Sequence, residues 1–204
     1  MSDAVTISLI SGITSVVLAI ITVVVKTWLD KRAEAKNHVH DEAINEADLG
    51  EMLYVQEYID EFRNDYEFDR ITVSQFHNGG KFFNGKSMKK FSVTYESCAP
   101  GISKIKREYQ NLLVSEFPKM FSDLFDVDMI IVNPECEKYH IVARDMALQG
   151  IVQNAIVPIR GLRGDLLGFI SCHNIGSADE RITADLSHVF ADKANQISGY
   201  LAKS

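Results

Sequence analysis

The chain has 204 residues, of which 46% are hydrophobic and 24% are charged, so its composition is that of a globular protein and not of a disordered one. Its formal net charge of −7 argues against nucleic acid as a partner, because binding to nucleic acid needs basic side chains that neutralise phosphates. Three widely spaced cysteines, Cys98, Cys136 and Cys172, include no Cys-x-x-Cys pair. An odd number in this arrangement fits neither a disulfide framework nor a zinc motif and favours a reducing compartment.

The first predicted element is a transmembrane helix over residues 5–25. No charged residue occurs from Ala4 to Val25, and a helix needs about 20 such residues to cross the hydrocarbon core. A buried strand is the competing interpretation, but strands longer than about 10 residues are uncommon. A cleaved signal peptide would begin with basic residues, whereas Asp3 is the only charged side chain before the run. The residues expected to contact lipid are Val5, Ile7, Ile10, Val17, Ile21, Val25 and Trp28.

The residues that flank this span predict its orientation. Lys26, Lys31, Arg32 and Lys36 follow the span, and no Lys or Arg precedes it. Because positive charge stays on the cytoplasmic side, we expect a single-pass protein of the inner membrane with its C-terminal domain in the cytoplasm. Trp28 stands where an interfacial aromatic residue is common. Residues 1–36 are therefore predicted to form the anchor and a basic juxtamembrane turn.

Residues 37–66 are predicted to form a helical connector. Its two histidines at 38 and 40 do not share a helix face, so no metal site is expected there. From residue 46 to residue 66, apolar side chains recur at the spacing of one helical face, at Leu49, Met52, Leu53, Ile59 and Phe62. This amphipathic helix is expected to open the following domain.

Residues 67–204 are predicted to form an α+β domain, an antiparallel sheet with flanking helices. The expected strands, which alternate or are β-branched, cover residues 70–76, 91–97, 128–132, 152–159 and 166–173. The expected helices cover residues 108–125, with Pro118 as a break or start, then 144–150 and 186–201. A turn is expected at residues 77–80, which read His-Asn-Gly-Gly. Strands grouped with helices on the sheet face define the α+β class.

This order of elements resembles a GAF domain, a sensory fold related to PAS. The resemblance is carried by the helix before Arg70-Ile71-Thr72-Val73-Ser74, the late hairpin, in which Asn154-Ala155-Ile156-Val157-Pro158-Ile159 is followed by Leu166-Leu167-Gly168-Phe169-Ile170-Ser171, and the closing helix from Thr183. It covers about residues 46–202 and implies a module that binds a small ligand or a protein partner. The chain contains neither the chromophore-binding cysteine motif of phytochromes nor a clear match to the cyclic-nucleotide residues of other GAF domains.

A Gly- and Asn-rich loop at residues 75–86 also carries three phenylalanines and suggests a ligand pocket. If it folds over one face of a GAF-like sheet, the expected ligand contacts are Phe76, His77, Asn78, Phe83, Tyr95 and Pro100. A purely structural turn, with phenylalanines covering the core, is the alternative.

Catalytic and metal sites receive less support from the sequence. Cys172 and His173 are adjacent, so in a strand their side chains point to opposite faces and do not form a nucleophile–base pair. No catalytic residue, metal or cofactor is expected, and Cys136, Glu137 and His140 are not expected to form a metal site. Arg160 and Arg163 lie in the late hairpin loop, where a solvated loop competes with an anion site.

The expected function is that of a membrane-tethered, cytoplasmic, non-catalytic GAF-like module. One alternative is a structural or interaction protein of the membrane with an empty GAF-like pocket, such as a bacteriophage protein that acts at the host membrane. A second alternative is a GAF-fold methionine sulfoxide reductase, which would use cysteine chemistry. The expected partners are membrane lipid, a second copy of the chain bound through helices, and an unknown small ligand or protein, but no nucleic acid.

Overall fold

The computed structural model describes residues 21–29, 46–81, 85–176 and 181–201. The chain divides into two units, Met1–Leu49 and Gly50–Ser204. In the first unit, residues 21–29 are helical and include Ile21, Val25 and Trp28, all of them exposed. Within the described ranges no helix combines the length and apolarity that a membrane crossing requires. Val5, Ile7, Ile10 and Val17 lie outside the described residues, so the anchor stays a prediction.

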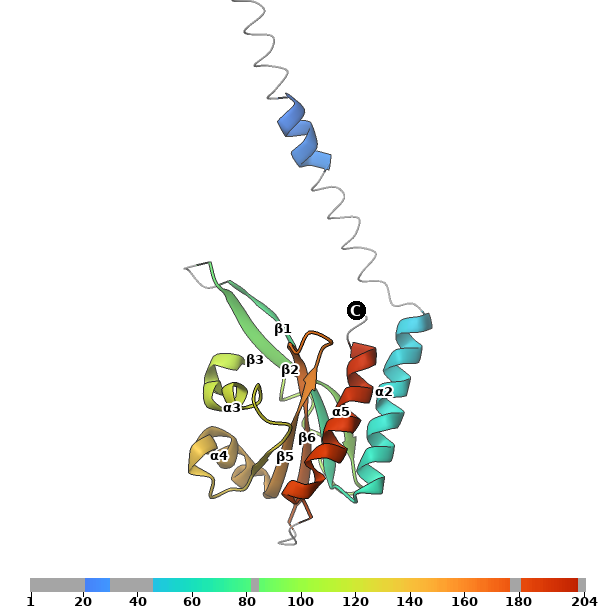
Figure 1. Ribbon diagram of the computed structural model, residues 1–204, viewed down its shortest axis with the longest axis vertical. Helices are drawn as coiled ribbons and strands as arrows, with labels where there is room; N and C mark the ends of the chain where they lie inside the picture. The colour runs from blue at the N-terminus through green and yellow to red at the C-terminus, as the bar shows by residue number, and fades with distance from the viewer. Residues whose placement is uncertain (1–20, 30–45, 82–84, 177–180, 202–204) are drawn as a thin grey trace, which may run out of the picture. The chain divides into compact units, whose positions relative to one another are not determined.

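Six strands in the described part of the second unit form one antiparallel sheet in the order β3-β2-β1-β6-β5-β4 (Figure 1). They are β1 (Arg70–Lys81), β2 (Ser87–Cys98), β3 (Leu112–Leu113), β4 (Ile130–Val132), β5 (Ile151–Arg160) and β6 (Leu166–Ile175). The first strand pairs with the last, so the hairpins β1–β2 and β5–β6 meet at the centre of the sheet. The predicted α+β class with an antiparallel sheet is confirmed.

Two long helices cover one face of the sheet, α2 (Glu46–Asp65) and α5 (Ser187–Leu201) (Figure 1). Phe62 of α2 and Phe190 of α5 are fully buried, and their ring centroids lie 5.3 Å apart. Ile71 and Val73 of β1 complete this core from the sheet. Burying a large apolar side chain contributes about 2 kcal/mol to the stability of the fold. The packing of these two helices therefore stabilises the sheet. Both helices were predicted from their apolar spacing.

Shorter helices cover the opposite face: η1 (Val114–Glu116), α3 (Pro118–Asp123), η2 (Glu137–Tyr139) and α4 (His140–Gln149). Gly150 ends α4 in a left-handed conformation with φ of 68°, as a C-terminal glycine commonly does. Five phenylalanines form the core here, with ring centroids between 5.2 and 6.4 Å apart: Phe76, Phe91, Phe117, Phe121 and Phe169. The sheet is therefore buried on both faces. A short 3₁₀ turn, η3 (Ala184–Leu186), leads into α5.

The turn predicted at residues 77–80 is wrong, because β1 continues through Lys81. Asn78 pairs with Lys89 and Lys81 pairs with Ser87, and the irregularity between these pairs accommodates the two glycines. Gly80 has a φ of 102°, a conformation that glycine adopts without strain. The glycines therefore mark a bulge in a long hairpin arm and not its turn.

The helix predicted over residues 108–125 is also largely wrong. Asn111 adopts a left-handed conformation with φ of 59°, which interrupts any helix. Leu112 and Leu113 then pair with β2 as β3. Only Pro118–Asp123 is α-helical, and Pro118 occupies its first turn, where the missing N–H costs nothing.

Candidate functional site

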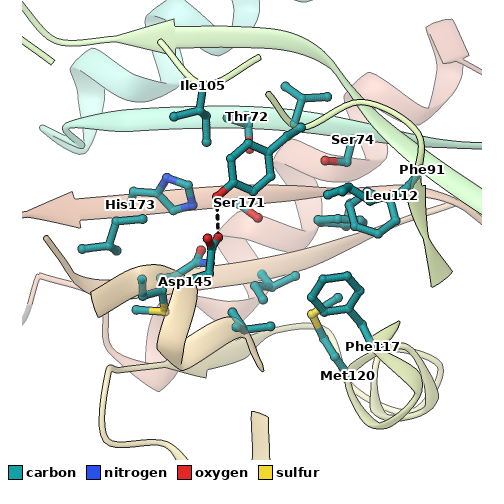
Figure 2. Close-up of a pocket in the computed structure, with 18 of the residues that line it drawn as sticks. Thr72, Ser74, Phe91, Ile105, Leu112, Phe117, Met120, Asp145, Ser171 and His173 are labelled. Carbon is teal, nitrogen blue, oxygen red and sulfur yellow. Dashed lines mark hydrogen bonds between the residues drawn. The ribbon is translucent and has the colours of Figure 1, made fainter. Parts of the chain in front are cut away.

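A cavity of about 80 Å³ lies between the sheet and the lid formed by α3, α4 and the segment from Ile105 to Leu112 (Figure 2). Side chains of β1, β5 and β6 that point away from α2 and α5 form its floor. They are Thr72, Ser74, Asn154, Ile156, Phe169, Ser171 and His173. The lid contributes Tyr109, Phe117, Met120, Asp145, Met146 and Gln149, among others.

Strand register gives the floor a polar end and an apolar end. Asn154 and Arg70 are both register partners of His173, one on each side, and Thr72 pairs with Ser171 in the next row. Because side chains two residues apart share a face, the third row on this face contains Phe169. The cavity is therefore amphipathic, with amide, hydroxyl and imidazole groups at one end and phenylalanines at the other.

Several polar groups of the floor are left without a protein partner. Asn154 is 4% exposed, and its Oδ1 atom accepts no hydrogen bond among the described residues. In the same part of the chain, the hydroxyls of Thr72, Ser74 and Ser171 form no side-chain hydrogen bond, although these residues are at most 7% exposed. An unpaired buried polar group costs about 1–3 kcal/mol. Such groups in a cavity call for water or a ligand.

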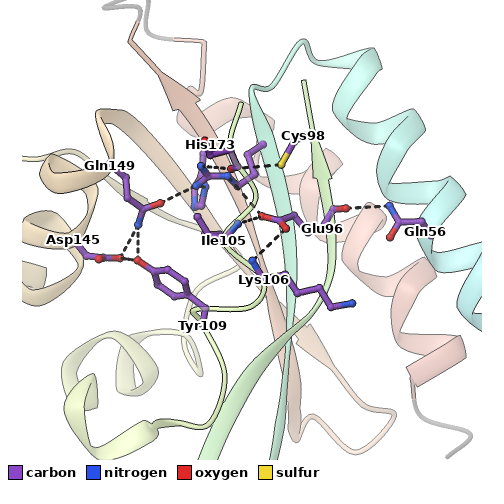
Figure 3. A network of polar contacts seen from close by, with 11 residues as sticks. Gln56, Glu96, Cys98, Ile105, Lys106, Tyr109, Asp145, Gln149 and His173 are labelled. Carbon is purple, nitrogen blue, oxygen red and sulfur yellow. Dashed lines mark hydrogen bonds and ion pairs between the residues drawn. The ribbon is translucent and has the colours of Figure 1, made fainter. Parts of the chain in front are cut away.

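The lid is held by a network of polar contacts (Figure 3). The Tyr109 hydroxyl donates to Asp145 Oδ2 at 2.5 Å, and Gln149 Nε2 donates to the same oxygen at 3.0 Å. Arg70 Nη1 donates to Gln149 Oε1 at 2.8 Å, which ties α4 to the sheet. Desolvation, together with the hydrogen bond to Asp145, raises the pKa of Tyr109. The Tyr109 hydroxyl therefore stays protonated at neutral pH and donates its hydrogen bond to Asp145.

The network continues through Arg70 and Glu96, both almost fully buried. Arg70 Nη2 donates to the Ser103 carbonyl at 3.0 Å, and Arg70 Nε lies 3.9 Å from Glu96 Oε1. The Glu96 carboxylate accepts hydrogen bonds from the backbone N–H groups of Ile105 and Lys106 at 2.7 and 3.2 Å. This buried pair therefore fixes the segment that leads to Tyr109. Such a pair holds geometry more than it adds net stability.

His173 is neutral at physiological pH. It is 5% exposed, and Arg70 Nη1 lies 3.4 Å from its Nδ1 atom. Burial lowers the pKa of His173, the Arg70 charge lowers it further, and together they bring it to about 3. The imidazole thus offers the cavity a hydrogen-bonding group without charge.

A surface groove of about 240 Å³ lies on the other side of the lid, between α3 and α4. Phe117, Met120 and Val142 line both the groove and the cavity. These three side chains therefore form the partition between the groove and the cavity. Phe117 and Val142 are half-buried, and their movement would join the two spaces.

The sequence-predicted ligand contacts are not brought together around this cavity. Phe76 packs in the phenylalanine cluster next to it, and Tyr95 packs on the opposite face, against the core under α2 and α5. His77 Nε2 lies 2.9 Å from Ser92 Oγ, and Asn78 Oδ1 accepts from Lys89 Nζ at 3.0 Å on the hairpin arm. Pro100 is exposed. Phe83 lies outside the described residues.

The other candidate groups also occupy separate places. Cys172 is buried in the core under α2 and α5, whereas His173 faces the cavity, so their predicted opposite orientation is confirmed. Arg160 donates to the Val127 carbonyl at 2.8 Å, and the side chain of Arg163 is 91% exposed. No cluster of metal-ligating side chains occurs among the residues that the structure describes.

The floor residues were missed at the level of sequence, although a signal for them exists. In β1, Thr72 and Ser74 alternate with the apolar Ile71 and Val73, and Ser171 occupies the corresponding place in β6. Such alternation normally marks a solvated face. If helices are expected on both faces of the sheet, the same polar residues predict a buried cavity that their side chains line.

Comparison with known proteins identifies the fold. No family profile and no curated protein sequence matches the chain. Among solved structures, the blue-light-absorbing form of the PixJ GAF domain from Thermosynechococcus elongatus aligns with a TM-score of 0.61 and 14% identity, over 79% of this chain and 90% of that one. A far-red cyanobacteriochrome photoreceptor aligns with a TM-score of 0.61 and 10% identity, over 87% and 97%.

A third similar structure is the phycoerythrobilin-bound GAF domain of a cyanobacterial phytochrome, with a TM-score of 0.59 and 13% identity over 84% of this chain and 93% of that one. At such low identity these similarities show the fold alone. The predicted GAF-like fold is therefore confirmed for the domain that contains the six-stranded sheet.

Proposed function

We propose that the domain is a non-catalytic sensory module that binds a small ligand in the cavity between the sheet and the lid. The observation that carries this proposal is the buried, unpartnered Oδ1 atom of Asn154, a residue that lines the cavity together with the hydroxyl-bearing Thr72, Ser74 and Ser171. A site with mostly apolar walls and a few oriented polar groups is typical of small-molecule recognition. The similar GAF domains include a phycoerythrobilin-bound form, so this fold holds a ligand in another protein.

The ligand is smaller than a bilin. The cavity measures about 80 Å³, and the five-phenylalanine cluster fills the apolar end of this face. Sites for drug-sized molecules are commonly about 300–1,000 Å³. A tetrapyrrole would not fit without displacing side chains of the lining, among them Phe91, Phe117 and Phe169.

Thiol chemistry is not supported. Burial raises the pKa of the Cys172 thiol, and burial with the nearby Glu96 charge raises the pKa of Cys98. A reactive cysteine needs a lowered pKa and an accessible sulfur. The methionine sulfoxide reductase alternative therefore lacks a nucleophile at these two positions.

The direct test is native mass spectrometry of the full chain released from detergent or nanodiscs. A co-purified small molecule with a defined mass supports ligand binding, and Asn154→Leu should lower its occupancy. Asn174→Leu is the matched control, because Asn174 is also fully buried with an unpartnered Oδ1 atom but does not line the cavity. A folded chain that repeatedly carries no ligand would favour an interaction protein with an empty pocket.

One feature favours that interaction alternative. The β1–β2 arm contains four lysines and no acidic residue between Arg70 and Glu96, although the chain carries a net charge of −7. Lys81, Lys86 and Lys89 are exposed there. An acidic protein partner would suit this arm, and charge reversal at Lys86 and Lys89 would abolish its capture.

The proposal includes the tether to the cytoplasmic face of the membrane through residues 5–25. An arginine at the centre of a membrane-inserted helix costs about 2.5–3.5 kcal/mol. The double variant Ile10→Arg and Val17→Arg should therefore move the protein from the membrane fraction to the soluble fraction. Equal partitioning of the variant and the wild type would contradict the tether.

We also propose a homodimer through the helices. Leu49, Met52 and Leu53 of α2 are between 45% and 63% exposed, an unusual number of large apolar side chains on one short surface. A Met52→Cys variant should form a disulfide between copies under mild oxidation. An exposed control such as Glu57→Cys should form it more slowly if the apolar stripe is the contact.

A further inference from the structure

We propose that the cavity selects an uncharged small molecule that carries a hydroxyl or N–H donor on a compact apolar body, and that it rejects anions. This inference rests on the proposed ligand binding and specifies its chemistry. It sets the site apart from one built for carboxylate- or phosphate-bearing ligands.

The charges around the cavity exclude an anion. Among the described residues that line it, the only charged side chain is Asp145, which is an anion itself. His173 is neutral, because burial lowers its pKa far below neutrality. The nearby cation, Arg70, does not line the cavity, and its two Nη atoms already donate to Gln149 and Ser103. An anionic ligand would lose its hydration and gain no cationic partner.

The free hydrogen-bonding groups require a donor. Asn154 Oδ1 can only accept, and no described group satisfies it. The hydroxyls of Thr72 and Ser171, which face each other across β1 and β6, can donate or accept. A hydroxyl or an N–H group on the ligand would donate a hydrogen bond to the Asn154 side-chain carbonyl. The same ligand group would still have a lone pair or a second hydrogen with which to bond the hydroxyls of Thr72 and Ser171.

The opposite end of the cavity calls for an apolar body. Phe91, Phe117 and Phe169 line it together with Leu112 and Ile156. Phe91 packs edge-to-face against Phe117 and Phe169, with centroid distances of 5.7 and 5.3 Å. A small ring beside them would meet aromatic edges, an arrangement that aromatic pairs prefer.

The volume sets the size of the ligand. An engineered apolar cavity of about 150 Å³ holds one benzene ring, and this cavity of about 80 Å³ is roughly half as large. A ring with one polar substituent therefore fits only if the partition formed by Phe117, Met120 and Val142 yields toward the groove.

Four matched probes test the selection on the full chain: benzyl alcohol, benzoate, benzylamine in its ammonium form, and toluene. Saturation-transfer NMR and heteronuclear shift mapping report affinity and place. Benzyl alcohol should bind. Toluene should bind about three- to tenfold more weakly than benzyl alcohol, because it cannot donate the hydrogen bond. Benzoate should bind at least about tenfold more weakly than benzyl alcohol, because the cavity offers its charge no cationic partner. Benzylammonium should also bind more weakly than the alcohol, because Asp145 is already occupied by Tyr109.

Two variants assign these preferences to residues. Asn154→Leu should remove the advantage of benzyl alcohol over toluene, whereas Asn174→Leu should retain it. Asp145→Asn keeps an oxygen that accepts from Tyr109 and should bring benzoate closer to the alcohol.

The possible outcomes separate this inference from the proposed function. Benzoate or benzylammonium that binds as tightly as benzyl alcohol to the wild type would overturn the selection for an uncharged ligand, with ligand binding still standing. Equal binding of toluene would overturn the donor requirement. Failure of all four probes to shift cavity resonances would overturn the proposed site itself. The charge comparison uses only the wild type, so a variant that fails to fold does not affect it.

Discussion

Replacing His173 with glutamine should make the protein less sensitive to mild acid. His173 is 5% exposed between Arg70 of β1 and the cavity, and Tyr109 and Asp145 line the same cavity from the lid. In the folded chain its pKa is lowered to about 3, first by burial and then by the Arg70 charge. In the unfolded chain the imidazole returns to a pKa of about 6.5.

The direction and the size of the effect follow from these two values. Between about pH 6.5 and about pH 3 the unfolded chain binds a proton at His173 and the folded chain does not, so acid favours unfolding. The stability is fully present above the unfolded pKa and falls as the pH falls toward the folded pKa. At about pH 5 the unfolded state gains RT ln(1 + 10^1.5), which is about 2 kcal/mol. This figure does not depend on the folded pKa, provided that it lies well below 5.

The assay is urea denaturation of the full chain in detergent at about pH 8 and about pH 5, for the wild type and His173→Gln. Titration of the carboxylates is common to both proteins and cancels in the comparison. The wild type should lose about 2 kcal/mol more than the variant between the two pH values. Equal losses, within about 0.5 kcal/mol, would show that His173 is protonated in the folded state and would refute the neutral imidazole.

Three further predictions concern packing, reactivity and access. Gly168→Ala should lower the free energy of unfolding by about 3 kcal/mol, because the new Cβ would lie 2.0 Å from the Ser74 carbonyl oxygen. In the control Gly199→Ala, in α5, the new Cβ meets no atom within 4 Å, so the free energy of unfolding in urea should stay the same or rise by up to about 1 kcal/mol. Iodoacetamide should not modify the buried Cys172 in the folded chain at neutral pH but should modify it in urea, as peptide mass mapping would detect; modification at equal rates would contradict its burial. Phe117→Ala opens the partition between groove and cavity, so it should speed the exchange of benzyl alcohol with the cavity in NMR line-shape measurements. It should also lower the free energy of unfolding by about 2–3 kcal/mol. An unchanged exchange rate would show that ligands enter elsewhere.

Much of the fold could be predicted because it depends on local periodicity. The apolar spacing of α2 and α5 and the alternation in β5 and β6 are set by the faces that these elements bury, and burial leaves its mark in the sequence. The helix prediction for the segment from Glu108 to Phe125 was largely wrong for a physical reason. Leucines and phenylalanines occur in this segment because they cover a cavity and a sheet edge. Their spacing happens to match that of the apolar face of a helix, although most of the segment is not helical.

The site was less predictable, because it depends on register. Thr72, Ser171 and Asn154 are ordinary small polar residues in three strands far apart in sequence. Only the pairing of β1 with β6 and of β6 with β5 brings them together. The loop at residues 75–86 attracted attention for its composition, yet its glycines serve a bulge and its lysines lie on an arm away from the cavity. Unusual composition identified an unusual structure and not the binding site.

The polar network gives the proposed sensory role a physical route from the cavity to α2. Gln149 of the lid holds Arg70, Arg70 lies against Glu96, and the Glu96 backbone carbonyl accepts a hydrogen bond from Gln56 Nε2 of α2 at 3.2 Å (Figure 3). A ligand that draws Gln149 toward the cavity removes one hydrogen-bond acceptor from the buried Arg70 guanidinium, and a buried donor left unsatisfied costs about 1–3 kcal/mol. Arg70 must then shift or recruit another acceptor, and the Glu96 carboxylate already lies 3.9 Å from its Nε atom. The contacts that run from the cavity lining on one face of the sheet to α2 on the opposite face therefore pass through two buried charged residues, Arg70 and Glu96.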